Sequence, residues 1–243
     1  MPKVLISDTM SSRAEEVFRE RGVEVDVVTQ LDPAELQKII VNYDGLAVRS
    51  STKVTEKIIE AGSKLRVIGR AGIGVDNIDV GSASKKGIVV MNTPQGNSIT
   101  TAEHAIALLF ALARDIPQAN QSTHEGLWEK SKFMGVELYG KTLGVIGCGN
   151  IGSIVADRAI GLKMKVVSYD PFLSPEKATS LGVEKIEFDE LLQRSDFISL
   201  HTPMTDATKG IIDTKAISKM KDGVYIINCA RGGLVNEVDL KTA

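Results

Sequence analysis

The sequence is poor in the residues that staple small folds or bind metals. It has 243 residues but only two cysteines, Cys148 and Cys229, and three histidines. Neither cysteine has a second Cys or a His at a spacing typical of metal ligands. We therefore expect no disulfide framework and no metal site.

An excess of either charge is also missing. Lys and Arg number 29 and Asp and Glu 31, which gives a net charge of −2. A balance this close to neutral gives no reason to expect a nucleic acid or an anionic membrane as a partner. Any anion site has to be built locally, from a few residues.

Long apolar runs are absent too. The longest, AIALLFALA at 105–113, has nine residues, against the roughly 20 that span a bilayer. The N-terminus MPKVLISD reaches an Asp too early for the apolar core of a signal sequence. We expect no membrane partner, a cytoplasmic protein, and a buried helix at 105–113.

What the sequence does contain is a regular alternation of β-rich and helix-like segments. The β-rich runs of the first part lie at 4–8, 23–28, 45–50, 66–72 and 88–93. A long helical pattern follows at about 98–122, and the alternation restarts at 141. This rhythm predicts parallel sheets with helices on both faces. Asp32 with Pro33 is expected to begin one of the helices, and Gly62 to end another. We expect an α/β protein of two doubly wound domains, 1–97 and 98–243.

The segment KTLGVIGCGNIG carries glycines spaced G-x-G-x-x-G, directly after a predicted strand and before a helical pattern. That context makes an otherwise weak motif specific. Gly147 permits the tight turn, Gly149 lets a pyrophosphate approach the backbone, and Gly152 allows close helix–strand packing. The N–H groups at the start of the helix would then bind the pyrophosphate.

An acidic residue follows at the expected distance. Asp170 lies eighteen residues after Gly152, at the end of the next predicted strand. Its carboxylate can accept hydrogen bonds from the ribose hydroxyls and would repel a 2′-phosphate, so we expect NAD as the cofactor. The alternative is a tight turn that binds nothing.

Four other predicted strand ends carry polar or glycine-rich residues, and ligands of open α/β sheets bind at such ends. They are Arg49 with Ser50, RAGIGVDN around Ile73, HTP at 201–203 and CARGG at 229–233. Arg49 can bind an anion or form a surface ion pair, and the turn at Ile73 can bind a carboxylate or only turn a corner. Arg231 suits recognition of a planar anion.

The histidines are expected to have no catalytic role. His104 lies in an apolar helical pattern, where a packed, satisfied side chain is expected. His124 is expected in a solvated loop, and His201 in a loop that shapes the cofactor pocket. Cys148 is expected to be a small filler of the glycine loop.

Seven ordered blocks closely resemble the D-isomer-specific 2-hydroxyacid dehydrogenases over essentially the whole chain. They are VRSSTKVT, RAGIGVDNIDV, TPQGNSITTAEH, GKTLGVIGCGNIG, SYDP, LHTPMT and INCARGGLVNE. The resemblance implies a flavodoxin-like substrate domain, a Rossmann NAD-binding domain and hydride transfer from C2 of a small 2-hydroxyacid to NAD. KFMGVEL and NCARGG are most similar to the branch that oxidises D-3-phosphoglycerate to 3-phosphohydroxypyruvate, the first committed step of serine biosynthesis. Alternatives are a glyoxylate or hydroxypyruvate reductase and a non-catalytic NAD-binding sensor.

The resemblance also implies roles for single residues. Arg231, as the catalytic residue, would orient the substrate carboxylate and C2 oxygen, with the backbone of Ile73 and Gly74 on the same carboxylate. Arg49, Ser50 and Asn97 would face the far end of the substrate. The cofactor-binding residues would be Gly147, Gly149, Asn150, Ile151, Gly152, Asp170, Thr202, Pro203, Cys229 and Ala230.

In this family a histidine takes the hydroxyl proton and a glutamate holds that histidine, and both follow the CARGG block at a distance that lies past residue 243. The resemblance therefore implies an incomplete catalytic core that is nearly inactive by itself. Both domains would lack their C-terminal ends. A homodimer or higher homo-oligomer is expected from the apolar helix after Ser98, although a monomer could bury that helix against its own second domain.

Overall fold

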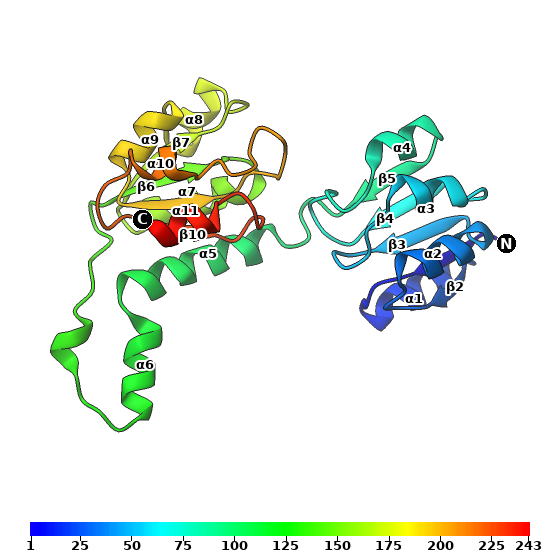
Figure 1. Cartoon of the computed structure of the whole chain (residues 1–243), viewed down its shortest axis with the longest axis horizontal. Helices are drawn as coiled ribbons and strands as arrows, with labels where there is room; N and C mark the ends of the chain where they lie inside the picture. The colour runs from blue at the N-terminus through cyan, green and yellow to red at the C-terminus, as the bar shows by residue number, and fades with distance from the viewer. The chain divides into compact units, whose positions relative to one another are not determined.

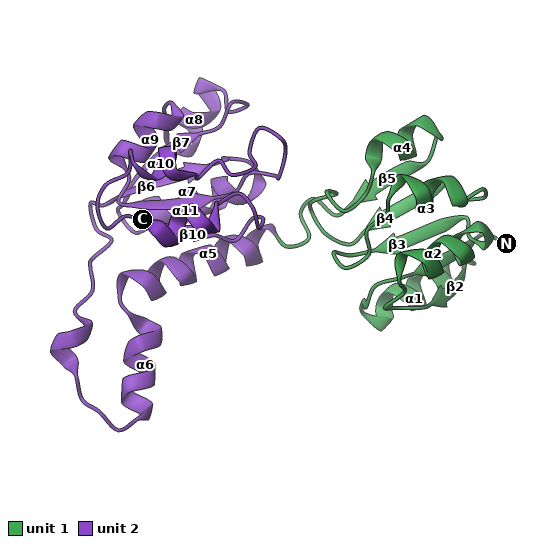
Figure 2. Ribbon diagram, in the orientation of Figure 1, with its two compact units in different colours: residues 1–97 green, residues 98–243 purple.

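Every strand in the computed structural model, which describes residues 1–243, runs parallel to its neighbours in one of two sheets (Figure 1). The chain forms two units, Met1–Asn97 and Ser98–Ala243 (Figure 2). Each unit has its own five-stranded sheet with helices packed on it. The predicted α/β class with two parallel sheets is confirmed.

Unit 1 has the strand order β2-β1-β3-β4-β5, the order of flavodoxin-like folds. Its strands are β1 (Lys3–Ile6), β2 (Glu24–Val27), β3 (Gly45–Val48), β4 (Val67–Arg70) and β5 (Val89–Asn92). Its helices are α1 (Ser12–Glu20), α2 (Pro33–Ile39), the 3-10 turn η1 (Ile40–Asn42), α3 (Glu56–Ala61) and α4 (Val80–Lys85). Leu5, Leu46 and Ile68 lie side by side on the three central strands and are fully buried.

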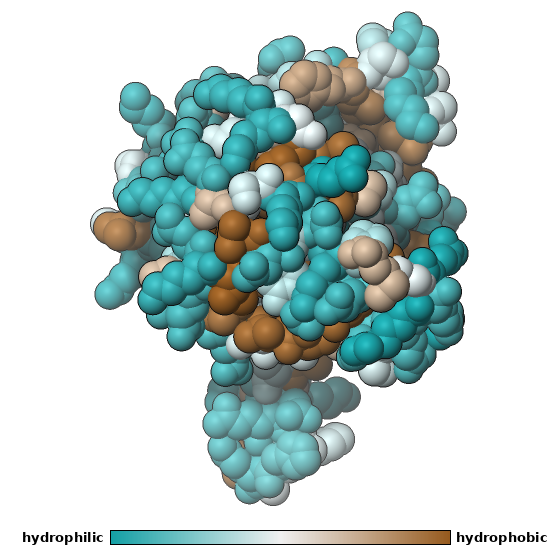
Figure 3. All heavy atoms as spheres, turned by 90° about the vertical axis from the view of Figure 1, so that its right-hand side faces the viewer, coloured by the Kyte–Doolittle hydropathy of each residue, from teal (hydrophilic) through white to brown (hydrophobic).

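Local sequence signals set the helix ends in unit 1. Asp32 caps α2 through the N–H groups of Ala34 and Glu35, with Pro33 in the first turn, and Gly62 ends α3, as predicted. The face that Figure 3 shows is mostly hydrophilic, with smaller hydrophobic patches between the hydrophilic side chains. Such a surface suits a folded domain in water.

Unit 2 begins with two helices and then builds its sheet in the order β10-β9-β6-β7-β8. The strands are β6 (Thr142–Ile146), β7 (Lys165–Tyr169), β8 (Glu184–Lys185), β9 (Phe197–Leu200) and β10 (Tyr225–Asn228). The helices are α5 (Ser98–Ala113), α6 (Ile116–His124), the 3-10 turn η2 (Lys130–Phe133), α7 (Asn150–Gly161), α8 (Pro175–Leu181), α9 (Phe188–Arg194), α10 (Thr214–Ile217) and α11 (Glu237–Thr242). β7 and β8 follow β6 on one side and β9 and β10 on the other, so the strand order reverses at β6. This reversal creates the switch point where Rossmann sheets bind ligands.

The apolar run at 105–113 lies in α5, but only one face of that helix is buried in the core of unit 2, while Leu108 and Leu112 are exposed. The expectation of a buried helix is therefore correct for one face only. Ala102, Ala105 and Leu109 are buried in the same cluster as Ala156 and Ala159 of α7. Small side chains let the two helices approach closely. None of the helices combines the length and hydrophobicity that crossing a lipid bilayer requires.

The single helix predicted at about 98–122 is wrong. The first helix ends at Ala113 and a second begins at Ile116, because Asp115 adopts a left-handed conformation with φ 50° and Pro117 lies in the first turn of α6. Residues 114–137 then form an arm that extends from the body of unit 2 (Figure 1). The arm closes where Val136 N–H donates to the carbonyl of Ala113 (2.7 Å). Gly135 (φ 59°) is required at this point, since a Cβ there would collide with that carbonyl.

Candidate functional site

The glycine loop of unit 2 follows β6 and runs into α7, and its three glycines have three different surroundings. Gly147 has φ 88°, and a Cβ on it would lie 2.9 Å from the backbone of His201 and Thr202. A Cβ on Gly152 would collide with the carbonyl of Gly147, whereas a Cβ on Gly149 would meet nothing within 4 Å. The tight turn and the close packing are as predicted, and the space above Gly149 is open to a ligand.

The start of α7 suits an anion. Its N-cap residue, Gly149, contributes no side-chain acceptor to the first turn. The first N–H groups of a helix point away from it and carry the positive end of its dipole. Asn150 is exposed there, while Ile151 turns inward onto the core. The backbone of this turn can therefore bind a phosphate group.

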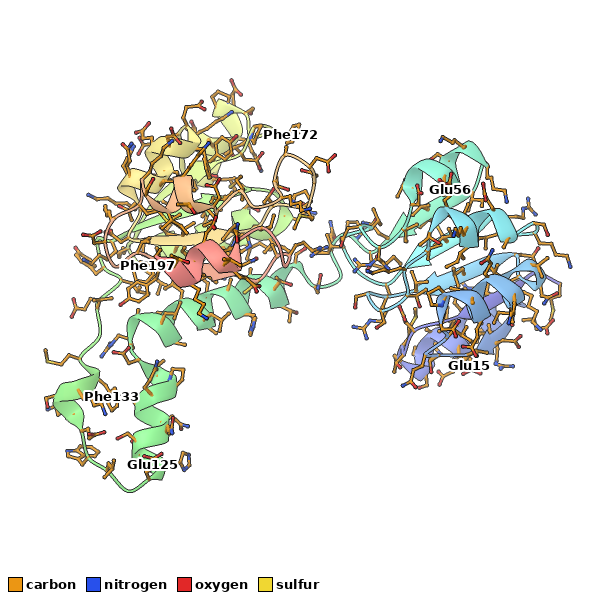
Figure 4. The ribbon with its side chains drawn as sticks, in the orientation of Figure 1. Glu15, Glu56, Glu125, Phe133, Phe172 and Phe197 are labelled. Atoms are coloured by element: carbon orange, nitrogen blue, oxygen red, sulfur yellow. The ribbon has the colours of Figure 1, made fainter.

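Asp170 lies next to the glycine loop, at the end of β7. One oxygen accepts the N–H of Cys148 in that loop (2.8 Å), and the other accepts the N–H of Phe172 (2.8 Å). A carboxylate oxygen can accept more than one hydrogen bond, so both can still accept from sugar hydroxyls. Phe172 itself projects into solvent, 95% exposed (Figure 4). No signal in the sequence predicts this aromatic side chain beside Asp170.

The HTP segment, His201 to Pro203, lies on the other side of the glycine loop, since His201 N–H donates to the carbonyl of Ile146 (2.8 Å). Thr208 Oγ1 donates to the carbonyl of Pro203 (2.6 Å) and fixes the loop. The His201 ring contacts Ser199 Oγ through Nε2 (2.8 Å), and burial lowers the pKa of His201 to about 4. At neutral pH this imidazole is uncharged and shapes the loop.

The CARGG segment after β10 lines a pocket of about 510 Å³, together with α5. Its lining residues are Thr100, Thr101, His104, Leu108 and Asn228 to Gly232. Asn228, which the sequence analysis missed, shapes this turn: Oδ1 accepts the N–H of Ala230 (3.1 Å) and Nδ2 donates to the carbonyl of Arg231 (2.9 Å).

Three side chains of this pocket have distinct environments. Arg231 is half-buried, and its Nη1 donates to the carbonyl of Ala230 (2.8 Å). Burial raises the pKa of Cys229, so it is a neutral thiol. The expectation of a packed His104 is wrong, because this residue is exposed and lines the pocket. The buried positions Ala102, Ala105 and Leu109 define the inner face of α5, and His104 lies off that face.

In unit 1, Arg49 and Ser50 are exposed at the end of β3. The guanidinium of Arg49 contacts the carbonyl of Thr9 through Nη1 (3.3 Å). Asn97 is exposed in the turn that closes the unit. The buried Asp8, after β1, accepts the N–H of Arg49 (2.6 Å). The sequence analysis did not single out Asp8, because a lone Asp after a strand carries no signature.

The turn around Ile73 and Gly74, after β4, is held by side chains. Asn92 Nδ2 donates to the carbonyl of Ile73 (2.6 Å), and Arg70 Nη1 donates to the carbonyl of Gly74. Gly72 makes room for the Arg70 guanidinium, which would lie 2.9 Å from a Cβ at that position. With these carbonyls bonded to side chains, the turn has its N–H groups to offer an anion. Arg70 and Asn92 were also missed.

The structure therefore brings the candidate residues together within each unit. The glycine loop, Asp170 and HTP meet at the switch point of unit 2, with CARGG at the end of the neighbouring strand β10. Arg49, Ser50, Ile73 and Gly74 lie at the carboxyl ends of adjacent strands of unit 1.

Comparisons with known proteins give a consistent result. Residues 106–243 match the family model described as "D-isomer specific 2-hydroxyacid dehydrogenase, NAD binding domain". The chain is 51% identical over 241 residues to a D-3-phosphoglycerate dehydrogenase of Archaeoglobus fulgidus, covering 99% of this chain and 46% of that protein. It is 46% identical to the human enzyme of that name, covering 97% and 44%. The chain thus spans less than half the length of these curated relatives.

Solved structures agree on the fold. The TT0316 protein of Thermus thermophilus superposes with a TM-score of 0.90 at 34% identity, covering 99% of this chain and 78% of that one. A D-lactate dehydrogenase of Aquifex aeolicus, complexed with NAD and lactic acid, superposes with a TM-score of 0.90 at 31% identity, covering 99% and 72%.

Proposed function

The chain belongs to the D-isomer specific 2-hydroxyacid dehydrogenase family and carries its NAD-binding domain, and from this premise we propose that it serves the NAD-dependent oxidation of D-3-phosphoglycerate to 3-phosphohydroxypyruvate. This reaction opens serine biosynthesis. The observation that carries the proposal is the switch point of unit 2, where an open glycine turn, an uncapped helix start and Asp170 adjoin one another. When bound, NAD accepts the hydride on its nicotinamide.

The cofactor assignments follow from this arrangement. Gly147, Gly149 and the start of α7 with Asn150 and Ile151 would hold the pyrophosphate, while Gly152 keeps α7 close. Asp170 would accept from the ribose hydroxyls and disfavour the 2′-phosphate of NADP. Thr202 and Pro203 would flank the cofactor.

Two further parts of unit 2 complete the cofactor and substrate contacts. The exposed ring of Phe172 suits stacking on the adenine. Cys229 and Ala230 would lie along the nicotinamide in the pocket after β10, with Arg231 binding the substrate carboxylate and C2 oxygen through its planar fork.

Unit 1 supplies the other candidate anion contacts. The N–H groups around Ile73 and Gly74 would bind the substrate carboxylate, and Arg49, Ser50 and Asn97 the phosphate end. The choice of a phosphorylated substrate is supported by the 46–51% identity to proteins named D-3-phosphoglycerate dehydrogenase. A glyoxylate reductase of Paecilomyes thermophila shares the fold at 30% identity.

Residues 1–243 themselves are proposed to bind NAD without appreciable turnover. A general base needs a partner that holds its ring in place. None of His104, His124 and His201 is hydrogen-bonded to an acidic side chain, and the half-buried ring of His201 contacts Ser199 instead.

We also propose that the protein is a cytoplasmic homodimer. The arm at 114–137 and its return to β6 expose large apolar side chains: Trp128 is 86% exposed, and Met134 and Tyr139 are each 75% exposed. A second copy of the chain would cover such a patch. Replacing Trp128 by Glu should shift the mass in light scattering toward the monomer, and an unchanged mass would contradict the dimer proposal.

Calorimetry on residues 1–243 tests the cofactor and substrate together. We expect NAD to bind at least about tenfold more tightly than NADP. D-3-phosphoglycerate should bind the NAD-loaded chain more tightly than D-lactate does. Absence of NAD binding would refute the dehydrogenase proposal, whereas equal affinity for the two acids would refute only the choice of substrate.

A further inference from the structure

Unit 1 contains a buried carboxylate that the proposed reaction does not use. Asp8 follows β1 and is only 5% exposed. Burying a carboxylate is unfavourable unless hydrogen bonds or an opposite charge compensate it. No lysine or arginine side chain forms an ion pair with Asp8. The compensation comes from a different source.

The donors are the backbone and hydroxyl groups of the segment Arg49–Thr52. Oδ2 of Asp8 accepts the N–H of Arg49 (2.6 Å) and the N–H of Thr52 (3.2 Å), and Oδ1 accepts the hydroxyl of Thr52 (2.8 Å). An ionised carboxylate only accepts. The hydroxyl of Ser7 must therefore donate to Thr52 Oγ1, 3.0 Å away. One carboxylate thus binds both ends of this segment.

The carbonyl groups of the same two residues are bound from another side. Asn77 Nδ2 donates to the carbonyls of Arg49 (2.7 Å) and of Thr52 (2.7 Å). Asp8 and Asn77 together satisfy the N–H and the C=O of both residues. Arg70 Nε also donates to the carbonyl of Arg49, at 3.4 Å. The segment lies beyond β3, so side-chain hydrogen bonds, most of them from Asp8 and Asn77, hold its conformation in place of a sheet ladder or helix.

We propose that Asp8 and Asn77 are positioning residues that hold Arg49–Thr52 in the conformation that presents Arg49 and Ser50 to the phosphate end of the substrate. The inference rests on the proposed function, because that function places the phosphate at Arg49. A segment already ordered before binding loses less conformational freedom when the ligand arrives. The benefit should therefore be specific to ligands that carry the phosphate.

The sign of the effect separates positioning from simple electrostatics. Asp8 is negatively charged and close to a proposed anion site, so its charge alone would weaken binding of a phosphate. If its charge dominated, Asp8→Ala would tighten phosphoglycerate. If positioning dominates, Asp8→Ala weakens phosphoglycerate by about 10- to 100-fold, as expected for the loss of hydrogen bonds to a charged acceptor.

Asp8→Asn should rescue most of the loss. Its oxygen can still accept the two N–H groups, and its NH2 can donate to Thr52 Oγ1 if the Thr52 hydroxyl then donates to Ser7. We expect an affinity within about threefold of the unmodified chain. Asn77→Leu, which keeps the volume but removes both donors, should reproduce the loss seen with Asp8→Ala.

The experiment is calorimetry of residues 1–243 loaded with NAD, titrated with D-3-phosphoglycerate and with D-glycerate. Asp44→Asn is the matched control, because Asp44 also accepts a backbone N–H, that of Lys3 (2.8 Å), but at the opposite end of the sheet. NAD affinity checks that unit 2 is intact. Unchanged or tighter phosphoglycerate binding in Asp8→Ala, or an equal loss for D-glycerate, overturns the proposal.

Hydrogen exchange at the amides of Arg49 and Thr52 provides a readout that needs no substrate. Exchange at both should accelerate in Asp8→Ala and stay slow in Asp44→Asn, with the rest of unit 1 unchanged. If the unmodified chain binds NAD but not phosphoglycerate, the proposed substrate fails while slow exchange at these amides still supports the positioning role. Fast exchange in the unmodified chain overturns that role.

Discussion

In unit 2 the conformation of the turn after β6 depends on glycines. In unit 1 the conformations of the turns after β3 and β4 depend on side chains that form hydrogen bonds to the backbone. Gly147 and Gly152 are required by close backbone neighbours. In unit 1 the turns are held by hydrogen bonds from four side chains, Asp8, Asn77, Arg70 and Asn92. The two kinds of turn respond differently to mutation. A side chain added to the glycine turn collides with the backbone, whereas removal of a hydrogen-bonding side chain in unit 1 leaves the turn less ordered.

Gly152→Ala should have the largest effect, because Gly152 has the closest backbone contact in the glycine turn of unit 2. The added Cβ collides with the carbonyl of Gly147 and forces α7 away from β6. We expect loss of measurable NAD binding in calorimetry and a destabilisation of about 1–3 kcal/mol in urea unfolding. Gly149→Ala, with nothing within 4 Å, should keep the stability and weaken only NAD. Equal behaviour of the two variants would contradict the assignment.

The second-largest effect is expected in the pH dependence of the free energy of unfolding. It should arise in unit 2, because all three histidines lie there. Burial lowers the pKa of His201 to about 4 from its usual value of 6.5. The unfolded chain therefore takes up this proton first as pH falls, and the free energy of unfolding decreases between about pH 6.5 and 4. Between pH 7 and 4 the unmodified protein should lose about 3 kcal/mol more than His201→Gln. Parallel stability curves from urea unfolding would contradict this.

Asp170→Ala tests the side chain that is proposed to bind the cofactor ribose in unit 2. We expect NAD to bind about 10- to 100-fold more weakly, since a charged acceptor is lost from the ribose. The preference for NAD over NADP should fall at the same time, because the repulsion of the 2′-phosphate disappears. In calorimetry the NAD affinity of Asp170→Asn should lie between those of the unmodified chain and of Asp170→Ala. A retained preference for NAD in Asp170→Ala would place the discrimination elsewhere.

Tyr43→Phe in unit 1 should have the smallest effect. The Tyr43 hydroxyl donates to Asp26 (2.7 Å), at a distance from the turns described above. Loss of one hydrogen bond costs about 1 kcal/mol. Urea unfolding should show that small decrease, and the affinity for phosphoglycerate should not change. A change in affinity would mean that the geometry of the anion site depends on packing throughout unit 1 and not on the hydrogen-bonded turns after β3 and β4.

The parts of the structure that the sequence predicted are those with local signals. Alternating β-rich and helical runs gave the two parallel sheets, and Asp32 with Pro33 gave the start of α2. The glycine spacing located the switch point, because glycines in such turns are required by backbone contacts. Each of these signals lies within a short stretch of chain.

Two of the residues without a sequence signal, Asp8 and Asn77, act across long sequence separations. Asp8 binds a segment more than forty residues away, and Asn77 binds the same segment from the opposite direction. Nothing near Asp8 in the sequence indicates its partners, which only the order of β1 and β3 brings together. The break at Asp115 was missed for another reason, because an apolar helical pattern continued through a residue that changes the chain direction.

The arm of unit 2 leaves and rejoins the body at one place, where Gly135 and Val136 meet the carbonyl of Ala113. A loop whose two ends are joined in this way can be shortened, lengthened or exchanged for that of a relative without changing the distance that the flanking chain must span. The fold of unit 2 therefore sets few limits on the length of the arm, and the limits on its composition come from the proposed dimer contact around Trp128.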